Sequence, residues 1–168
     1  DVLSAGVNDM HGFRFVEVQK SFGSNRVLRG IDLEAAQGEC VVIIGGSGSG
    51  KSVMLKLITG LLAPDRGRVF VLDAEVSAMR EEDLGPLRRR VGMLFQGGAL
   101  FDSLSVFENV AFPLREQGGR SEGEIRAAVE EKLGDVGLEG IGERAPSELS
   151  GGMRKRVALA RTIAMNPD

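Results

Sequence analysis

The chain has 168 residues, of which 42% are hydrophobic and 27% are charged. This balance is typical of a folded domain and excludes a largely disordered chain. The net charge of −3 argues against sequence-independent binding of nucleic acid and against a polybasic membrane anchor. Cys40 and His11 are the single cysteine and histidine, so neither an internal disulfide nor a histidine-rich zinc site is expected. The lack of a long apolar run and of a signal-peptide pattern favours a cytoplasmic location.

The first part of the chain is predicted to contain short strands on either side of a glycine-rich loop. Residues 1–12 show no periodic pattern and are interpreted as a leader. A turn at residues 23–25 separates two segments rich in β-branched residues, which predicts an antiparallel hairpin. The continuously apolar run Val41–Ile44 is typical of a strand covered on both faces in a parallel sheet. The predicted strands are Phe13–Val18, Val27–Leu33, Val41–Ile44, Arg68–Leu72 and Val91–Phe95, and helical spacing covers Val53–Leu62.

The second part of the chain changes to a helical pattern. The polar stretch Ser77–Arg90 is interpreted as a helix with a turn, and no strong strand signal occurs from Gly97 to Pro146. Ser121 and Glu124 have the spacing of a capping box, which predicts the start of a helix. The apolar stripe that follows is typical of a helix facing a core and consists of Ile125, Val129, Leu133 and Val136.

The segment Gly45–Ser52 has the spacing G-x-x-x-x-G-K-S and lies between an apolar strand and an apolar helix. Its glycines let backbone N–H groups converge on phosphate oxygens, and the positive end of the following helix dipole adds to the attraction. Lys51 supplies a full charge to the β- and γ-phosphates, and the Ser52 hydroxyl helps to complete the shell of a bridging Mg²⁺. A nucleoside triphosphate is the expected ligand, bound by Gly45, Gly46, Ser47, Gly48, Ser49, Gly50, Lys51, Ser52 and Val53.

A second motif is needed to separate kinases, GTPases, helicases and transport ATPases, which share such a loop. The stretch Leu149–Arg161 begins Leu-Ser-Gly-Gly-Met. By itself this is an ordinary capped helix start, or a second anion site made by free amides and a helix dipole. Together with the phosphate loop it resembles the signature motif of the ATP-binding cassette (ABC) ATPases, with Met153 where glutamine is usual. The resemblance implies that Ser150, Gly151, Gly152 and Met153 touch the γ-phosphate held by a second ATPase subunit in a head-to-tail dimer.

Two further residues match the ABC pattern. Phe22 lies where the family places an aromatic side chain that stacks on adenine, although a buried strand-end residue is the alternative. Gln96 directly follows a predicted strand and matches the Q-loop glutamine, which in this family contacts Mg²⁺ and the attacking water. The resemblance therefore makes Lys51 and Gln96 the expected catalytic residues and Ser52 and Gln96 the expected metal ligands, with ATP and Mg²⁺ bound.

The string Gln96–Glu116 is the most discriminating part of the chain. It resembles the Mla-type ABC ATPases of bacterial lipid trafficking and organic-solvent tolerance, and Met153 agrees with this subgroup. The resemblance implies phospholipid transport, an ATPase on the inner face of the plasma membrane, and a permease, MCE-domain proteins and periplasmic lipid-binding proteins as partners. If exposed, Leu100, Phe101 and Phe107 suit a groove for a short permease helix, and burial is the alternative.

The expected fold class is α/β: a P-loop NTPase with a RecA-like core sheet, an antiparallel β layer and an α-helical ABC subdomain. The expected organisation is a partial ABC ATPase domain with a leader (1–12), a core (13–96), a helical subdomain (97–150) and a signature helix returning to the core (151–168).

Residues 1–168 do not include the next core strand, which in ABC ATPases carries the Walker B aspartate and the catalytic glutamate. The resemblance is thus to a C-terminally truncated ATPase, and hydrolysis by this chain alone is not expected. The alternatives are a catalytically inactive nucleotide-binding interaction module, an ABC ATPase of a different transporter, and an ABC ATPase without transport. A small-molecule kinase is disfavoured because no lid or acceptor site is recognisable.

Overall fold

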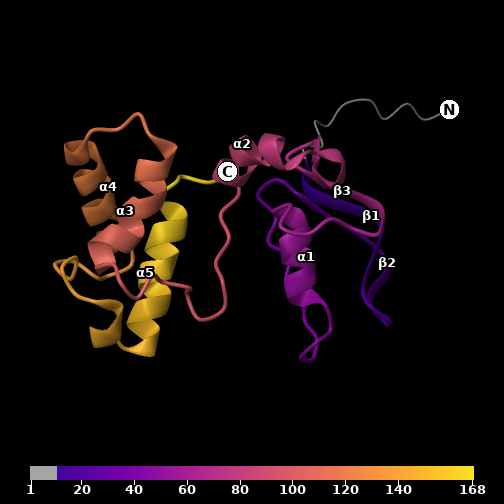
Figure 1. Cartoon of the computed structure of the whole chain (residues 1–168), viewed down its shortest axis with the longest axis horizontal. Helices are drawn as coiled ribbons and strands as arrows, with labels where there is room; N and C mark the ends of the chain where they lie inside the picture. Colours follow the sequence, from indigo (N-terminus) through magenta and orange to yellow (C-terminus); the bar gives the residue numbers. More distant parts are fainter. Residues whose placement is uncertain (1–10) are drawn as a thin grey trace. The chain divides into compact units, whose positions relative to one another are not determined.

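The computed structural model describes residues 11–168, which fall into one compact unit ending at Arg88 and another spanning Arg89–Asp168 (Figure 1). Residues 1–10 of the predicted leader lie outside the described residues. The last two leader residues instead begin the first strand, because His11 already pairs with Ala36.

The first unit is built on a four-stranded antiparallel sheet with the order β2-β1-β3-β4. Gly23, with φ of 60°, and Ser24 form the tight turn between β1 and β2, as the conformational freedom of glycine allows. This sheet confirms the predicted antiparallel layer, with strands longer than the sequence pattern indicated. The strands are β1 (His11–Phe22), β2 (Asn25–Ala36), β3 (Arg66–Val71) and β4 (Ala74–Glu75).

Helix α1 (Lys51–Ile58) packs against β3 and buries Met54 and Leu57. It begins two residues before the predicted helix, because the Met54 N–H already bonds to the Gly50 carbonyl at 3.0 Å. It ends at Ile58, four residues early, where Gly60 takes a positive φ of 65°. A 3₁₀ turn, η1 (Val76–Ala78), and helix α2 (Glu81–Arg90) follow and confirm the predicted helix with a turn.

Two predicted strands, Val41–Ile44 and Val91–Phe95, are absent from the structure. Their apolar side chains lie on the surface, with Val42 75% and Ile44 91% exposed, and Leu94 and Phe95 are exposed as well. A strand of a parallel sheet needs neighbouring strands to hydrogen-bond with its backbone, and packed helices to cover both of its faces. Within residues 11–168 the four strands of the sheet pair only with one another, and every pair is antiparallel. Neither apolar run therefore has a neighbouring strand to pair with. The predicted core sheet is therefore not formed by these residues.

The second unit is helical, as predicted from residue 97 onward. Its helices are α3 (Val106–Gln117), α4 (Glu122–Asp135) and α5 (Gly151–Ile163), with a 3₁₀ turn, η2 (Pro146–Glu148), before α5. The three helices pack against one another around a shared apolar core. In the described part of the chain, no helix combines the length and the apolar character needed to cross a bilayer.

The start of α4 confirms the predicted capping box. The Ser121 N–H donates to Glu124 Oε2 at 2.7 Å, and the Glu124 N–H donates to Ser121 Oγ at 3.3 Å. Ile125, Val129 and Leu133 are buried in the helical core, whereas Val136 packs against its edge. The apolar stripe thus places α4 as the sequence predicts.

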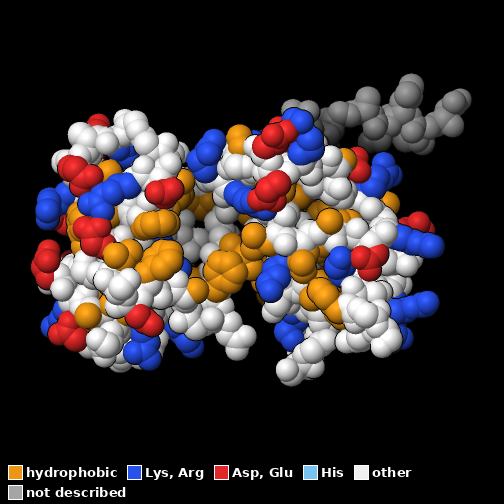
Figure 2. Space-filling model, in the orientation of Figure 1, with side chains coloured by type: hydrophobic (Ala, Val, Ile, Leu, Met, Phe, Trp, Pro, Cys, Tyr) orange, Lys and Arg blue, Asp and Glu red, His pale blue; other side chains and the backbone are white. Residues whose placement is uncertain are grey.

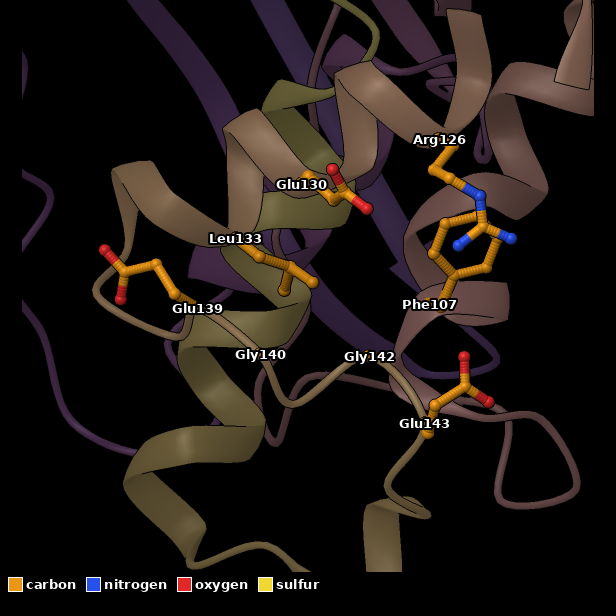
Figure 3. A pocket seen from close by; sticks show the side chains of 8 residues that line it. All are labelled: Phe107, Arg126, Glu130, Leu133, Glu139, Gly140, Gly142 and Glu143. Atoms are coloured by element: carbon orange, nitrogen blue, oxygen red, sulfur yellow. The ribbon is translucent and has the colours of Figure 1, made fainter. Parts of the chain in front are cut away.

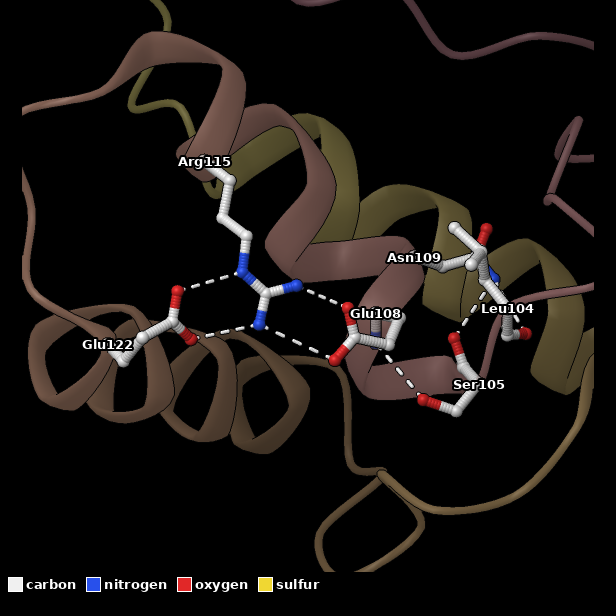
Figure 4. A network of polar contacts seen from close by, with 6 residues as sticks. All are labelled: Leu104, Ser105, Glu108, Asn109, Arg115 and Glu122. Carbon is white, nitrogen blue, oxygen red and sulfur yellow. Dashed lines mark hydrogen bonds and ion pairs between the residues drawn. The ribbon is translucent and has the colours of Figure 1, made fainter.

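Arg115 joins α3 to α4 through two carboxylates (Figure 4). Its guanidinium bonds to both carboxylate oxygens of Glu122, at 3.0 and 2.9 Å, and forms an ion pair with Glu108, which lies two turns earlier on the same face of α3. Hydrogen bonds from Arg115 lower the pKa of Glu122, and the two carboxylates raise the pKa of Arg115. This bidentate arrangement links the first turn of α4 to the last turn of α3.

Candidate nucleotide-binding site

The glycine loop Gly45–Gly50 leads directly into α1. Residues Gly45–Ser49 are exposed, whereas Gly50 is buried and caps the helix in a left-handed conformation with φ of 95°. A Cβ at Gly50 would lie 2.9 Å from Leu28 Cδ2 and 3.0 Å from Val27 Cγ1, so both its φ and the close approach of β2 require glycine. No side chain caps α1, and its first N–H groups remain available to an anion.

Lys51 folds back onto the loop. Its ammonium donates to the carbonyls of Gly45 at 2.6 Å and Gly46 at 2.8 Å, and to Ser49 Oγ at 3.3 Å. The charge therefore sits beside the free amides at the start of α1. Phosphate oxygens are stronger acceptors than these carbonyls, so a bound phosphate is able to draw the ammonium away from them.

Ser52 and Val53 occupy the first turn of α1, with Ser52 exposed and Val53 half-buried. The Ser52 hydroxyl is an oxygen donor of the kind that Mg²⁺ accepts. Among residues 11–168 there is no cluster of His, Cys, Asp and Glu that would hold a metal by itself. The donor set fits a Mg²⁺ ion that takes most of its ligands from phosphate oxygens and water.

Phe22 closes β1 in the same unit and is 47% exposed, which excludes the alternative of a buried strand-end residue. The Lys20 ammonium lies 5.7 Å from the centroid of its ring. Lys20 is itself held by Asp65, at 2.8 Å. The ring is thus presented to solvent at the hairpin turn, as a stacking residue must be.

Asp65 bonds to this end of β1 and makes the stability of the fold depend on pH. The Lys20 ammonium and the Ser21 N–H, at 2.7 Å, both donate to its carboxylate and hold the pKa of Asp65 below its ordinary value of 3.8. A carboxyl with a lowered folded-state pKa stabilises the fold above its unfolded pKa and loses that effect as the pH falls through the folded value. Below about pH 4, we expect the free energy of unfolding to fall more steeply for the unsubstituted chain than for Asp65→Asn. Urea unfolding at a series of pH values measures this, and parallel curves would contradict it.

Gln96 belongs to the second unit and lies exposed in a turn closed by the Gly98 N–H, which donates to the Phe95 carbonyl at 3.0 Å. Gly97 and Gly98 have φ of 84° and 88°, which accounts for the two glycines after Gln96. Ser52 lies in the other unit, so the predicted joint contact of Ser52 and Gln96 with Mg²⁺ stays a prediction.

The signature residues open α5 as predicted. Ser150 is the N-cap, and its Oγ accepts from the Met153 N–H at 3.2 Å. Gly151 and Gly152 are exposed in the first turn, so their N–H groups face solvent. Met153 is partly buried and packs its apolar side chain against the helical core.

The three apolar residues that would suit a permease groove if exposed differ in their burial. Phe101 is exposed and contacts the exposed Phe112 with ring centroids 5.0 Å apart, and Leu100 is half-buried. Phe107 is buried in the helical core, so for this residue the alternative of burial holds, because it lies on the core-facing side of α3. The exposed pair is therefore Phe101 and Phe112, and the sequence pattern had not indicated Phe112.

Phe107 instead forms one wall of a surface pocket of about 390 Å³ (Figure 3). The Arg126 guanidinium covers its ring at 5.0 Å. Glu130, Glu139 and Glu143 line the same pocket. Three carboxylates against one guanidinium repel a triphosphate, so this pocket does not compete with the glycine loop as a nucleotide site.

Sequence reasoning missed two residues that shape the segment after Gln96. Asn109 is completely buried and bonds to the backbone of Phe101, Leu104 and Ser105. Arg161 bonds to the backbone of Gly98 and Ala99. An asparagine inside an apolar helical stripe was the available signal for the first, and the sequence offered none for the second.

The sequence model of the family described as ABC transporter matches residues 28–168. The chain belongs to the ABC transporter family. It is 46% identical over 148 residues to the probable ribonucleotide transport ATP-binding protein mkl of Mycobacterium leprae, which covers 88% of this chain and 43% of that protein. It is 44% identical over 146 residues to the intermembrane phospholipid transport system ATP-binding protein MlaF of Haemophilus influenzae. This match covers 87% of this chain and 55% of that protein. The chain thus spans about half the length of these curated relatives.

The family is also evident in the fold. A dimeric structure of a post-hydrolysis state of the ATP-binding cassette MJ0796 bound to ADP and Pi matches with a TM-score of 0.85 and 35% identity, covering 92% of this chain and 70% of that chain. This confirms the expected fold class, an α/β ABC cassette with an antiparallel layer and a helical subdomain.

Proposed function

We propose that this chain is the nucleotide-binding part of an ABC transporter ATPase and that it binds Mg²⁺-ATP on Gly45–Ser52. One observation carries the proposal: the Lys51 ammonium and the uncapped amides of α1 converge at the exposed loop. Amides, helix dipole and lysine together favour a polyphosphate over other anions. Val53 continues the first turn of α1, and Phe22 supplies the ring for adenine.

Mg²⁺ supplies charge neutralisation of the phosphates when it is bound. Ser52 would hold the ion together with phosphate oxygens, and Gln96 would hold it from the second unit. Lys51 orients the β- and γ-phosphates, and Gln96 orients the attacking water. Hydrolysis also needs a general base and a Walker B carboxylate, which the family resemblance places after α5. We therefore assign ATP hydrolysis to a protein of the length of the relatives.

A second subunit completes the proposed site. The exposed amides of Gly151 and Gly152, capped by Ser150, would face the γ-phosphate bound by the partner copy, with Met153 packed behind them. The dimeric state of the solved cassette supports this arrangement. The transmembrane partner is a permease, and the exposed Phe101 and Phe112 are apolar residues that would suit it.

For the substrate we propose phospholipid. The string Gln96–Glu116, Met153 and the similarity to MlaF support a lipid transporter with MCE-domain and periplasmic lipid-binding partners. The ATPase would then lie in the cytoplasm against the inner face of the plasma membrane. The relative mkl, of similar identity, is named for ribonucleotide transport, so a different substrate is the alternative that the experiment must separate.

Reconstitution tests the proposal. The full-length protein is assembled with its permease in proteoliposomes, and ATP hydrolysis is followed together with movement of a fluorescent phospholipid. Hydrolysis that depends on Lys51 and drives phospholipid movement supports the proposal. Hydrolysis without phospholipid movement indicates a different transporter, and nucleotide binding without hydrolysis indicates an inactive interaction module.

Phe22→Ala tests the adenine contact separately from the phosphates. Stacking of a base on an aromatic ring contributes about 1–3 kcal/mol, so we expect the Kd for Mg²⁺-ATP to rise about tenfold. Phe22→Trp keeps a stacking face and is expected to bind within about twofold of the unsubstituted chain. Isothermal titration calorimetry measures both variants. Equal affinity of the alanine and tryptophan variants would show that no base stacks on residue 22.

A further inference from the structure

The turn that carries Gln96 is attached to α5, the helix that begins with the signature residues. Gly98 is buried against this helix, where an added Cβ would lie 3.1 Å from Ala158 Cβ and 3.3 Å from the Arg154 carbonyl oxygen. The close approach therefore needs glycine at position 98. It places the backbone of the turn in direct contact with the second and third turns of α5.

Arg161 stabilises this contact with two hydrogen bonds. Its Nη2 donates to the Gly98 carbonyl at 2.8 Å, and its Nη1 donates to the Ala99 carbonyl at 2.9 Å. The guanidinium also lies 5.9 Å from the centroid of the Phe101 ring. The planar fork of arginine matches two successive carbonyls in a way that a single ammonium does not.

Arg161 has no carboxylate partner among residues 11–168, where the recorded ion pairs involve other residues. The side chain is half-buried, and this burial lowers the pKa of Arg161. A charge that loses water and gains backbone acceptors and an aromatic ring, but no carboxylate, is a costly way to hold a loop. Its benefit must lie in the position of the turn it holds.

We propose that Arg161 is a positioning residue for Gln96, because it clamps the Gln96 turn to α5 and makes that turn move with the signature end of the helix. Ser150 and Arg161 are eleven residues apart on one rigid helix, about 16 Å along its axis. A shift of α5 when the signature meets a nucleotide thus reaches Gln96 through two hydrogen bonds. This inference rests on the proposed function, in which Gln96 orients the attacking water.

Arg156 supplies a matched control. It lies on the same helix and also donates to two carbonyls, those of Val136 at 2.9 Å and Gly137 at 3.1 Å, but these are far from Gln96 in the sequence. Arg156→Ala therefore removes the same chemistry from α5 without touching the Gln96 turn. A general weakening of the helix would affect both variants alike.

The experiment measures ATP hydrolysis by the full-length protein assembled with its membrane partner. We expect Arg161→Ala to lower kcat about tenfold with little change in KM, because positioning and not binding is lost. In a Gln96→Ala background, adding Arg161→Ala should change kcat by less than about twofold, since the residue acts through Gln96. Arg156→Ala should leave kcat near that of the unsubstituted protein. Arg161→Lys, which keeps the charge and one hydrogen bond, should show a smaller effect of the same kind.

Hydrogen exchange of residues 96–101 gives a readout that does not need ATP. Arg161→Ala should speed exchange there, and Arg156→Ala should not. Faster exchange with a protein that neither binds nor hydrolyses ATP would overturn the proposed function while showing that the clamp exists. Multiplicative effects of Arg161→Ala and Gln96→Ala on kcat, or unchanged exchange at 96–101, would overturn the role of Arg161 in an active ATPase.

Discussion

Replacement of Lys51 by alanine is expected to weaken binding of Mg²⁺-ATP about a hundredfold. The ammonium is the one full positive charge that the structure places within the glycine loop, in contact with Gly45, Gly46 and Ser49. Charged hydrogen bonds to phosphate contribute about 1.5–3 kcal/mol, which corresponds to about a tenfold to hundredfold change in Kd. Isothermal titration calorimetry of both chains under the same Mg²⁺ concentration measures the change.

Lys56 offers the matched control for Lys51. It lies on α1 as well, in the last turn, and is exposed. Lys56→Ala removes the same charge from the same helix away from the loop, so we expect its affinity to stay within about twofold of the unsubstituted chain. The free energy of unfolding should change little in either variant, because Lys51 bonds only to exposed groups. Equal losses of affinity at positions 51 and 56 would mean that net charge, and not the loop, attracts the nucleotide.

Asn109→Ala is expected to have the largest effect on stability, about 3 kcal/mol of unfolding free energy. The side chain is completely buried. Its Oδ1 accepts from the Phe101 N–H at 2.8 Å, and its Nδ2 donates to the carbonyls of Phe101 at 3.0 Å, Ser105 at 3.0 Å and Leu104 at 3.2 Å. Alanine would remove the partner of the Phe101 N–H and of the Leu104 carbonyl and leave a cavity beside α3, whereas the Phe101 and Ser105 carbonyls also accept from backbone N–H groups. Urea unfolding followed by circular dichroism measures the loss.

Glu116 provides the control for Asn109. It lies on the exposed side of α3, and its replacement by alanine is expected to change the free energy of unfolding by less than about 0.5 kcal/mol. Because Asn109 holds the segment from Phe101 to Ser105, its loss should also loosen the chain just after the Gln96 turn. Similar stability of the Asn109→Ala and Glu116→Ala variants would show that the buried amide contributes little.

Local signals in the sequence predicted most of what the structure confirms. The capping box at Ser121 and Glu124, the hairpin around Gly23, and the glycine loop before α1 each depend on residues a few positions apart. Their chemistry is satisfied by neighbouring backbone, so the sequence pattern alone determines them. The Ser150 cap at the start of α5 follows such a local pattern as well.

The features that sequence analysis missed depend on distant partners. Val41–Ile44 has the composition of a buried strand, but a strand forms only when another strand pairs with it, and none does within residues 11–168. Arg161 contacts carbonyls 62 and 63 positions earlier, which no periodicity reveals. The sequence left open whether Phe107 is exposed or buried, because the packing of α3 against α4 and α5 decides its burial.

Hydrogen exchange with and without Mg²⁺-ATP tests most directly whether nucleotide binds at the glycine loop. Gly45–Ser49 are exposed and no side chain caps α1, so the amides of the loop and of the first turn of the helix should exchange quickly in the free chain. The proposed site predicts that saturating Mg²⁺-ATP slows exchange in residues 45–53 and that Lys51→Ala abolishes the protection. ATP binding that leaves exchange in residues 45–53 unchanged would contradict the assignment of the phosphate site to this loop.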